Sequence, residues 1–174
     1  RDAQGRRRAE SALRAPAEMD VTSIELLALG TSSQVPTRQR NHNGYLLRFG
    51  DEDILFDPGE GTQRQLARAR VGVERVRRIF ITHFHGDHCL GLAGVIQLLS
   101  HASPEAPVQL YFPASGRRYY ERAVEASIYD SRVALEPHPV EREGPLVSAG
   151  ALSASARRLD HGVQVFGYRL EVRS

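Results

Sequence analysis

The stretch Thr82-His83-Phe84-His85-Gly86-Asp87-His88 gathers three histidines and one aspartate within six residues, directly after the apolar run Ile79-Phe80-Ile81. Imidazole nitrogens and carboxylate oxygens are ligands that Zn²⁺ prefers in proteins. Four such groups at the end of a buried strand would repel one another once they were protonated or desolvated, and a bound divalent cation removes that difficulty. The stretch therefore predicts a metal site, and an exposed, histidine-rich polar loop is the alternative interpretation.

The spacing within this stretch indicates that it can serve more than one metal. His83 and His85 lie on the same side of an extended segment. The turn at Gly86 brings Asp87 and His88 to a second position. Two neighbouring metals at such a loop can act together on one scissile oxygen.

The composition indicates one globular domain. The chain has 174 residues, of which 41% are hydrophobic and 25% charged, and it lacks an apolar run of the ~20 residues that cross a bilayer. All 23 basic residues are arginines, so this bias cannot be read as a nucleic-acid patch, and the net charge is only +2. The single Cys89 excludes an internal disulfide and suits a cytoplasmic location. We expect Cys89 to fill apolar space rather than to bind metal.

The first 18 residues lack apolar periodicity, and the only methionine is Met19. We interpret residues 1–18 as a disordered extension that is not native, with the natural start at Met19. A functional basic arm is the alternative. Residues 19–174 are then the structured part.

The hydrophobic pattern predicts alternating strands and helices, which is an α/β arrangement. Strands are expected at 23–29, 44–49, 54–56, 78–81, 108–112, 133–135, 152–156 and 165–172. Helices are expected at 62–71, 90–99 and 115–129. In the last helix the inner face should carry Tyr119, Ala123, Val124 and Ile128.

Two further residues outside the cluster stand at strand ends. Asp57 precedes the turn Pro58-Gly59 and is predicted to orient a ligand histidine, although a simple Asp-Pro-Gly turn is the alternative. His161 ends a strand-like segment before Gly162 and is the other candidate ligand. The remaining histidines are interpreted as loop or helix-end residues: His42, His101 and His138.

Strands that alternate with helices, together with a His-x-His-x-Asp-His loop, resemble the metallo-β-lactamase fold. That fold is a four-layer αβ/βα sandwich with a two-metal site along one edge of its sheets. The flanking sequence is similar to the ribonuclease Z family, in which many members carry Cys where this chain has Pro58. The matching segments are 29–32, 35–37, 40–41, 56–63, 79–88, 91–94, 111–116, 159–162 and 166–170.

This resemblance implies a zinc-dependent endoribonuclease that removes the 3′ trailer from precursor tRNA. His83, His85 and His161 would bind the first zinc, and Asp87 and His88 the second. Asp87 would also act as general base. The resemblance further implies two zinc ions per subunit and a homodimer.

The family's bridging aspartate and one more histidine lie further along its chain and have no counterpart before Ser174. We therefore expect this chain to be the N-terminal part of the enzyme, without the arm that grips tRNA. Two other functions stay open. One is a different hydrolase of the same fold, acting on a thioester, sulfate ester or small phosphodiester; the other is an inactive zinc-binding fragment.

Overall fold

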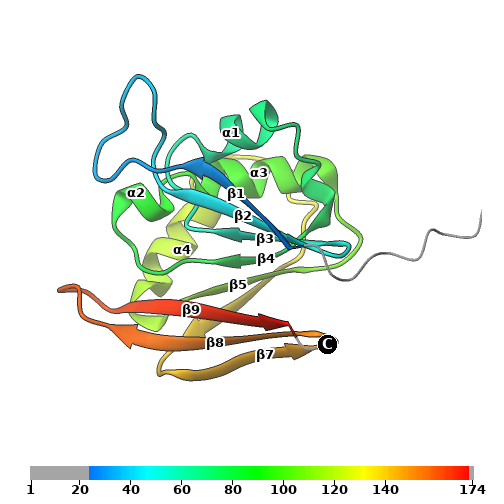
Figure 1. Cartoon of the computed structure of the whole chain (residues 1–174). Helices are drawn as coiled ribbons and strands as arrows, with labels where there is room; N and C mark the ends of the chain where they lie inside the picture. The colour runs from blue at the N-terminus through cyan, green and yellow to red at the C-terminus, as the bar shows by residue number, and fades with distance from the viewer. Residues whose placement is uncertain (1–23, 173–174) are drawn as a thin grey trace, which may run out of the picture.

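The computed structural model describes residues 24–172, so the interpretation of residues 1–18 and of Met19 lies outside the described part (Figure 1). A six-stranded sheet has the order β1-β2-β3-β4-β5-β6. Its strands are β1 Ile24–Gly30, β2 Gly44–Phe49, β3 Glu52–Phe56, β4 Val76–Phe80, β5 Val108–Pro113 and β6 Leu135–Val140. The first three strands are antiparallel, and β3 to β6 are parallel.

A second, antiparallel sheet has three strands in the order β7-β8-β9. They are β7 Gly144–Ala149, β8 Leu152–Leu159 and β9 Val165–Val172. The helices are α1 Thr62–Arg68, α2 Gly86–Cys89, α3 Leu92–Ala102 and α4 Arg117–Val124, with short 3₁₀ turns at Val73–Arg75 and Ala114–Gly116. No helix in the described part is long and apolar enough to span a membrane.

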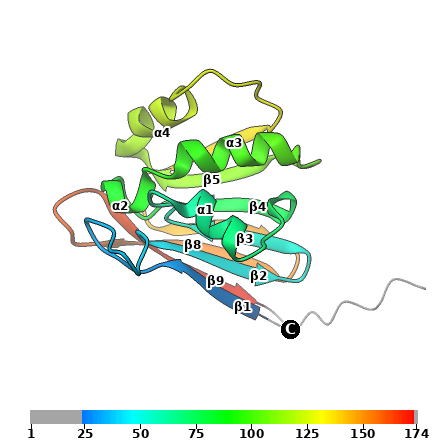
Figure 2. The same cartoon turned by 90° about the horizontal axis from the view of Figure 1, so that it is seen from above.

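The six-stranded sheet lies between the helices and the second sheet (Figures 1 and 2). One apolar cluster fills the helical side and includes Leu66, Ile96 and Phe112. The other fills the space between the sheets, where Phe80 stacks on Phe56 and Tyr111. The described residues thus form three of the layers that the predicted sandwich requires, and they bury two separate cores.

The positions of most elements were predicted correctly, but the helix at 115–129 was wrong in length and in orientation. A 3₁₀ turn precedes α4, which ends at Val124, so Ile128 lies beyond the helix and is fully exposed. Tyr120 rather than Tyr119 faces the core, where its ring stacks on Phe112 at 4.9 Å between centroids. The starting residue of the helix decides which tyrosine faces inward, and the apolar pattern alone did not show it.

The segment around Pro137-His138-Pro139 is also different from the prediction, which made it a rigid loop. It forms β6, at the edge of the sheet, and His138 pairs with Tyr111 of β5. Proline is tolerated on an edge strand because one side of the strand needs no hydrogen-bond donor. The neighbouring strand β7 was missed because Gly144-Pro145 begins it and only a few apolar residues follow.

The parallel strands place their carboxyl ends at one edge of the sheet. Asp57 follows β3, the histidine stretch follows β4, and Ser115 follows β5. The loop that joins β8 to β9 reaches the same edge, next to α2 (Figures 1 and 2). Loops at this edge of a parallel sheet can bring polar side chains from distant parts of the chain together.

Candidate metal centre

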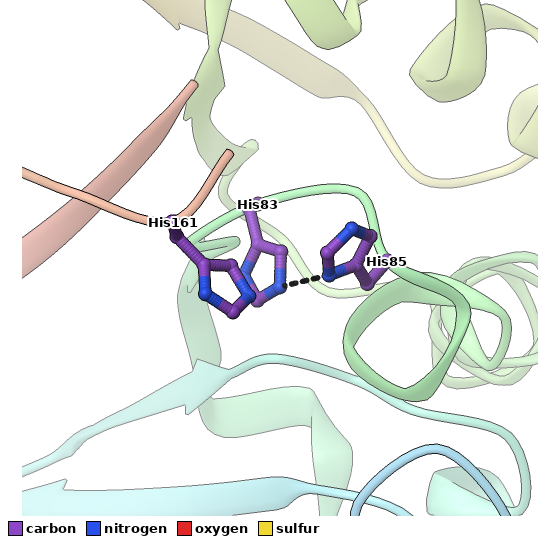
Figure 3. A group of neighbouring side chains, drawn as sticks. All are labelled: His83, His85 and His161. Atoms are coloured by element: carbon purple, nitrogen blue, oxygen red, sulfur yellow. Dashed lines mark hydrogen bonds between the residues drawn. The ribbon is translucent and has the colours of Figure 1, made fainter. Parts of the chain in front are cut away.

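Three histidine rings converge at this edge from two different segments (Figure 3). His83 and His85 come from the loop after β4, and His161 comes from the loop between β8 and β9. Each offers one ring nitrogen, and these nitrogens all lie within 4.8 Å of one another. Nε2 of His83 is 3.0 Å from Nδ1 of His85. His83 is buried, whereas His85 and His161 are exposed.

A hydrogen-bond network that starts at Asp57 orients the buried ring of His83. The backbone N–H and the hydroxyl of Thr82 both donate to the Asp57 carboxylate, at 2.7 and 2.8 Å. The Thr82 oxygen lies 3.0 Å from Nδ1 of His83. Because the hydroxyl proton is used toward Asp57, the Thr82 oxygen accepts the Nδ1 proton of His83. This tautomer leaves the Nε2 lone pair of His83 facing the other two rings.

The same carboxylate orients His88. Nδ1 of His88 lies 2.9 Å from Oδ2 of Asp57, so this nitrogen donates and Nε2 is the free acceptor of the neutral ring. The Asn43 amide nitrogen lies 3.1 Å from that Nε2 and 3.4 Å from Oδ2 of Asp87. Asp87 also accepts the backbone N–H of Gln34 at 3.0 Å. A second group of ligand-type atoms is thereby assembled beside the three histidines.

The two groups adjoin each other. The ring centroids of His83 and His88 are 4.2 Å apart, and Nε2 of His88 is 3.5 Å from Oδ2 of Asp87. The stretch after β4 therefore contributes residues to both groups.

Asp57 is held in an unusual backbone conformation. Its φ is +45°, a left-handed value that non-glycine residues seldom adopt. The next loop residues pack against α2 without space for a side chain. A Cβ on Gly59 would lie 2.2 Å from the Asp87 carbonyl oxygen, and one on Gly91 would lie 2.0 Å from the Gly59 carbonyl oxygen. The close packing of this turn on α2 accompanies the placement of Asp57 beside the histidine stretch, where its carboxylate accepts hydrogen bonds from Thr82 and His88.

Burial and the neighbouring imidazoles of His88 and His85 lower the pKa of His83 to about 4. His83 is therefore neutral at pH 7, which is the form that binds a metal ion.

In the second group, the pKa of His88 is raised and the pKa of Asp87 is lowered. Burial would lower the pKa of His88, but the hydrogen bond and the charge of Asp57 outweigh it and raise that pKa. Burial would raise the pKa of Asp87, but the hydrogen bond from Gln34 and the charge of His88 hold it below its usual value. Asp87 is thus ionised at neutral pH and can serve as an anionic ligand.

Contacts between the two sheets set the position of His161. The backbone N–H of Phe166 donates to the Thr82 carbonyl oxygen at 3.0 Å. The Tyr168 hydroxyl donates to the Ile81 carbonyl oxygen at 2.9 Å. Both bonds tie β9 to the segment that begins the metal loop, so the preceding loop brings His161 to the other histidines.

The three histidines fit a zinc ion. Tetrahedral zinc with Zn–N bonds of about 2.0–2.1 Å places ligand nitrogens about 3.3 Å apart. The observed separations, from 3.0 Å to at most 4.8 Å, are within a small side-chain adjustment of that value. The donor atoms are imidazole nitrogens, and a hydrogen bond to Thr82 fixes the tautomer of His83, as is usual for metal-binding histidines.

The structure brings together every residue predicted for the site: His83, His85, Asp87, His88, His161 and Asp57. Their roles as ligands and as general base stay predictions. The thiol of Cys89 donates to the His85 carbonyl oxygen, and burial raises its pKa to about 11, so it is a packing residue. His101 lies in the last turn of α3.

Three residues of the site were not predicted. Thr82 and Asn43 make direct hydrogen bonds to the candidate ligands. His42, interpreted as a loop residue, is buried, and neither of its ring nitrogens has a hydrogen-bond partner among the described residues. The Thr next to the first ligand was a signal that could have been used, whereas Asn43 and His42 depend on how a distant loop folds back.

The sequence profile of the metallo-beta-lactamase superfamily matches residues 37–157. The chain belongs to this superfamily, as the fold and the histidine site indicate. The predicted sandwich class is thereby confirmed.

Within the superfamily, the chain is similar to ribonuclease Z. It is 55% identical over 147 residues to ribonuclease Z of Nocardia farcinica, which is 84% of this chain and 48% of that protein. It is 47% identical over 145 residues to ribonuclease Z of Chlamydia trachomatis serovar L2, again 48% of that protein. The predicted resemblance to this family is confirmed, and the chain spans about half the length of the curated relatives it matches.

Comparison with solved structures agrees with the similarity to ribonuclease Z. The crystal structure of the short form of human tRNase Z superposes with a TM-score of 0.77 at 28% identity, over 84% of this chain and 64% of that one. A diphosphatase of the PhnP family superposes with a TM-score of 0.67 at 21% identity, which shows a shared fold. The fold is therefore compatible with more than one substrate.

Proposed function

We propose that this chain carries the zinc site of an endoribonuclease that removes the 3′ trailer from precursor tRNA. The single observation that supports this most is the convergence of His83, His85 and His161 from two sheets, beside Asp87 and His88. The similarity to ribonuclease Z at 47–55% identity supports the substrate. The products would be a tRNA with a free 3′-OH and a trailer with a 5′-phosphate.

In this proposal His83, His85 and His161 hold one zinc ion, and Asp87 and His88 contribute to a second position. A divalent cation held there polarises a phosphoryl oxygen and makes water a stronger nucleophile at neutral pH. The residues of this chain bind the cation, orient its ligands and accept a proton. Asp57 fixes the tautomers of His83 and His88, and the ionised carboxylate of Asp87 accepts a proton from the attacking water.

The test is the cleavage of a labelled precursor tRNA with a 3′ trailer by the zinc-loaded chain. The cleavage is measured with the chain alone and with the chain mixed with the part of the Nocardia farcinica ribonuclease Z that the similarity does not cover. We expect cleavage after the discriminator nucleotide in at least one of the two mixtures, and none with His83→Ala. Hydrolysis of bis(p-nitrophenyl) phosphate without any cleavage of precursor tRNA would instead support a small-phosphodiester hydrolase.

A homodimer and a cytoplasmic location belong to the same proposal. The lone cysteine and the access to precursor tRNA that the function requires favour the cytoplasm. Sedimentation of the complete protein tests the dimer, and a monomer at micromolar concentration would contradict it.

A further inference from the structure

A cavity of about 340 Å³ opens directly beside His85. Its walls come from three segments, which are the histidine loop after β4, the turn that leads into α4 and the loop that carries His161. The lining includes Phe84, His85, Arg118, Tyr119 and Gln164. A ligand that extends away from the three histidines can enter this cavity without leaving the site.

Two aromatic rings and an arginine contact one another in this cavity. The ring of Phe84 stacks on that of Tyr119, with centroids 5.7 Å apart and an interplanar angle of 28°. Cζ of Arg118 lies 4.6 Å from the centroid of Tyr119, and Nη2 of Arg118 donates to the Tyr119 hydroxyl at 2.6 Å. The guanidinium is therefore positioned before any ligand binds, which lowers the entropy that binding must overcome.

The cavity walls are held by specific contacts. The backbone N–H of Ser115 donates to Oε1 of Gln164 at 2.9 Å, and Nε2 of Gln164 donates to the Glu141 carbonyl oxygen at 3.4 Å. A Cβ on Gly116 would lie 2.0 Å from the ring of Phe84, so the ring packs directly on this backbone. The turn before α4, the ring of Phe84 and the loop that carries His161 are thus joined into one continuous wall.

Exposed arginines of α4 lie close to the cavity, and one of them, Arg118, lines it. Arg117, Arg118 and Arg122 on α4 are all exposed. Among residues 24–172, no carboxylate lies in ion-pair contact with any of these three arginines. An anionic ligand in the cavity would meet the guanidinium of Arg118, which donates to the Tyr119 hydroxyl but forms no ion pair within residues 24–172. Planar guanidinium groups bind phosphate with two hydrogen bonds and stack on nucleobases.

We propose that this cavity is the subsite for the single-stranded nucleotide that adjoins the scissile phosphate. Arg118 binds the phosphate of that nucleotide, and the base stacks on the outer face of the guanidinium. Stacking on planar side chains, combined with a cation for the backbone, is how proteins bind single-stranded RNA without reading its sequence. The inference rests on the proposed function and adds the residues that hold the RNA next to the metal site.

The test measures the binding of a fluorescein-labelled, single-stranded RNA hexanucleotide to the zinc-loaded chain by fluorescence anisotropy. Arg118→Gln should weaken binding about 10-fold, because it removes the planar group on which the base stacks and the cation that binds the phosphate. The slope of log K against log salt should also fall by about 0.7, which corresponds to one lost phosphate contact. Arg118→Lys should keep the slope and recover only part of the affinity.

The matched control is Arg68→Gln, which removes the same charge from an exposed position at the last residue of α1. It should change the affinity less than twofold. Equal binding by both glutamine variants, with zinc content and circular dichroism unchanged, would overturn the subsite and leave the proposed function intact. Absence of RNA binding by the wild-type chain at millimolar concentration would overturn both.

Discussion

The two segments that form the histidine site differ in how their positions are fixed. The loop after β4 is buried at His83, and its rings are hydrogen-bonded to Thr82 and Asp57. The loop before β9 carries His161 at the surface, and strand contacts outside the site hold it in place. Hydrogen bonds within the site organise the β4 side, whereas the position of the β9 side depends on the docking of the two sheets.

This difference has a consequence for metal binding. The Asp57 network fixes tautomers as well as ring positions, so the β4 side presents its lone pairs before a metal arrives. His161 completes the set only when the second sheet is in place. The β4 side should therefore contribute most of the zinc affinity, because its ligands are already oriented. The β9 side should contribute less, and its contribution should depend on the stability of the contact between the two sheets.

The largest effect is expected from the replacement of the central ligand. His83→Ala should reduce zinc affinity by about 10²- to 10³-fold, because roughly 10–16 kcal/mol of binding free energy is shared among the ligands of a typical zinc site. Competition with a fluorescent zinc chelator measures this loss. An unchanged zinc affinity would remove His83 from the site and end the comparison between the two sides.

A pH dependence should separate the buried side from the exposed one. The unfolded chain binds a proton at His83 near pH 6.5, and the folded chain only near pH 4. The free energy of unfolding without zinc should therefore fall as the pH is lowered from 6.5 to 4, and the contribution of His83 should not vary above pH 6.5.

The full loss through His83 is about 3 kcal/mol, and the raised pKa of His88 offsets part of it because it contributes in the opposite direction. Urea denaturation in chelator at pH 5 and pH 7.5 measures the change, with His83→Gln as the control that removes it. A wild-type chain whose stability falls no more than that of His83→Gln would contradict the burial of this ring as a neutral imidazole.

The network behind His83 can be tested through its hydroxyl. Thr82→Val keeps the shape of the side chain and removes the acceptor for Nδ1 of His83, so zinc affinity should fall about 10- to 100-fold. Thr82→Ser should restore most of it, because the serine hydroxyl can make both hydrogen bonds. If the valine and serine variants bind zinc equally, the hydroxyl has no positioning role.

The smallest effect is expected on the β9 side. Tyr168→Phe removes the hydrogen bond to the Ile81 carbonyl oxygen and should lower the free energy of unfolding by about 1 kcal/mol. Burial raises the pKa of Tyr168, so its hydroxyl stays a donor at all ordinary pH values. Zinc affinity should fall less than fivefold when it is titrated under conditions in which the variant is fully folded. A larger loss of affinity than that of Thr82→Val would reverse the order of the two sides.

The sequence could name the candidate ligands of the β4 side because they are contiguous. Ligand type, spacing and a preceding apolar strand are all local features, and His83, His85, Asp87 and His88 could be named from them. Asp57 was found for a similar reason, since an aspartate at the end of a strand is a recognisable position. His161 was noticed at the end of a strand-like segment, and the family resemblance then supplied its role beside histidines that lie more than 70 residues earlier in the chain.

What the sequence did not predict depends on tertiary contacts. Asn43 and His42 reach the site only because the loop between β1 and β2 folds over α2, and no local pattern shows that. The face of α4 was mistaken because a 3₁₀ turn shifts the start of the helix. The strand expected at 133–135 meets β6 only at its first residue, because the prolines that follow are disfavoured in a central strand, although an edge strand tolerates them.

X-ray absorption of the zinc-loaded chain tests the central claim most directly, because it counts the imidazoles bound to the metal. The account predicts three histidine nitrogens at about 2.0–2.1 Å in the wild-type chain. In His161→Ala, two should remain, with weaker zinc binding. An identical spectrum and affinity for the wild type and His161→Ala would contradict a site built from both sheets.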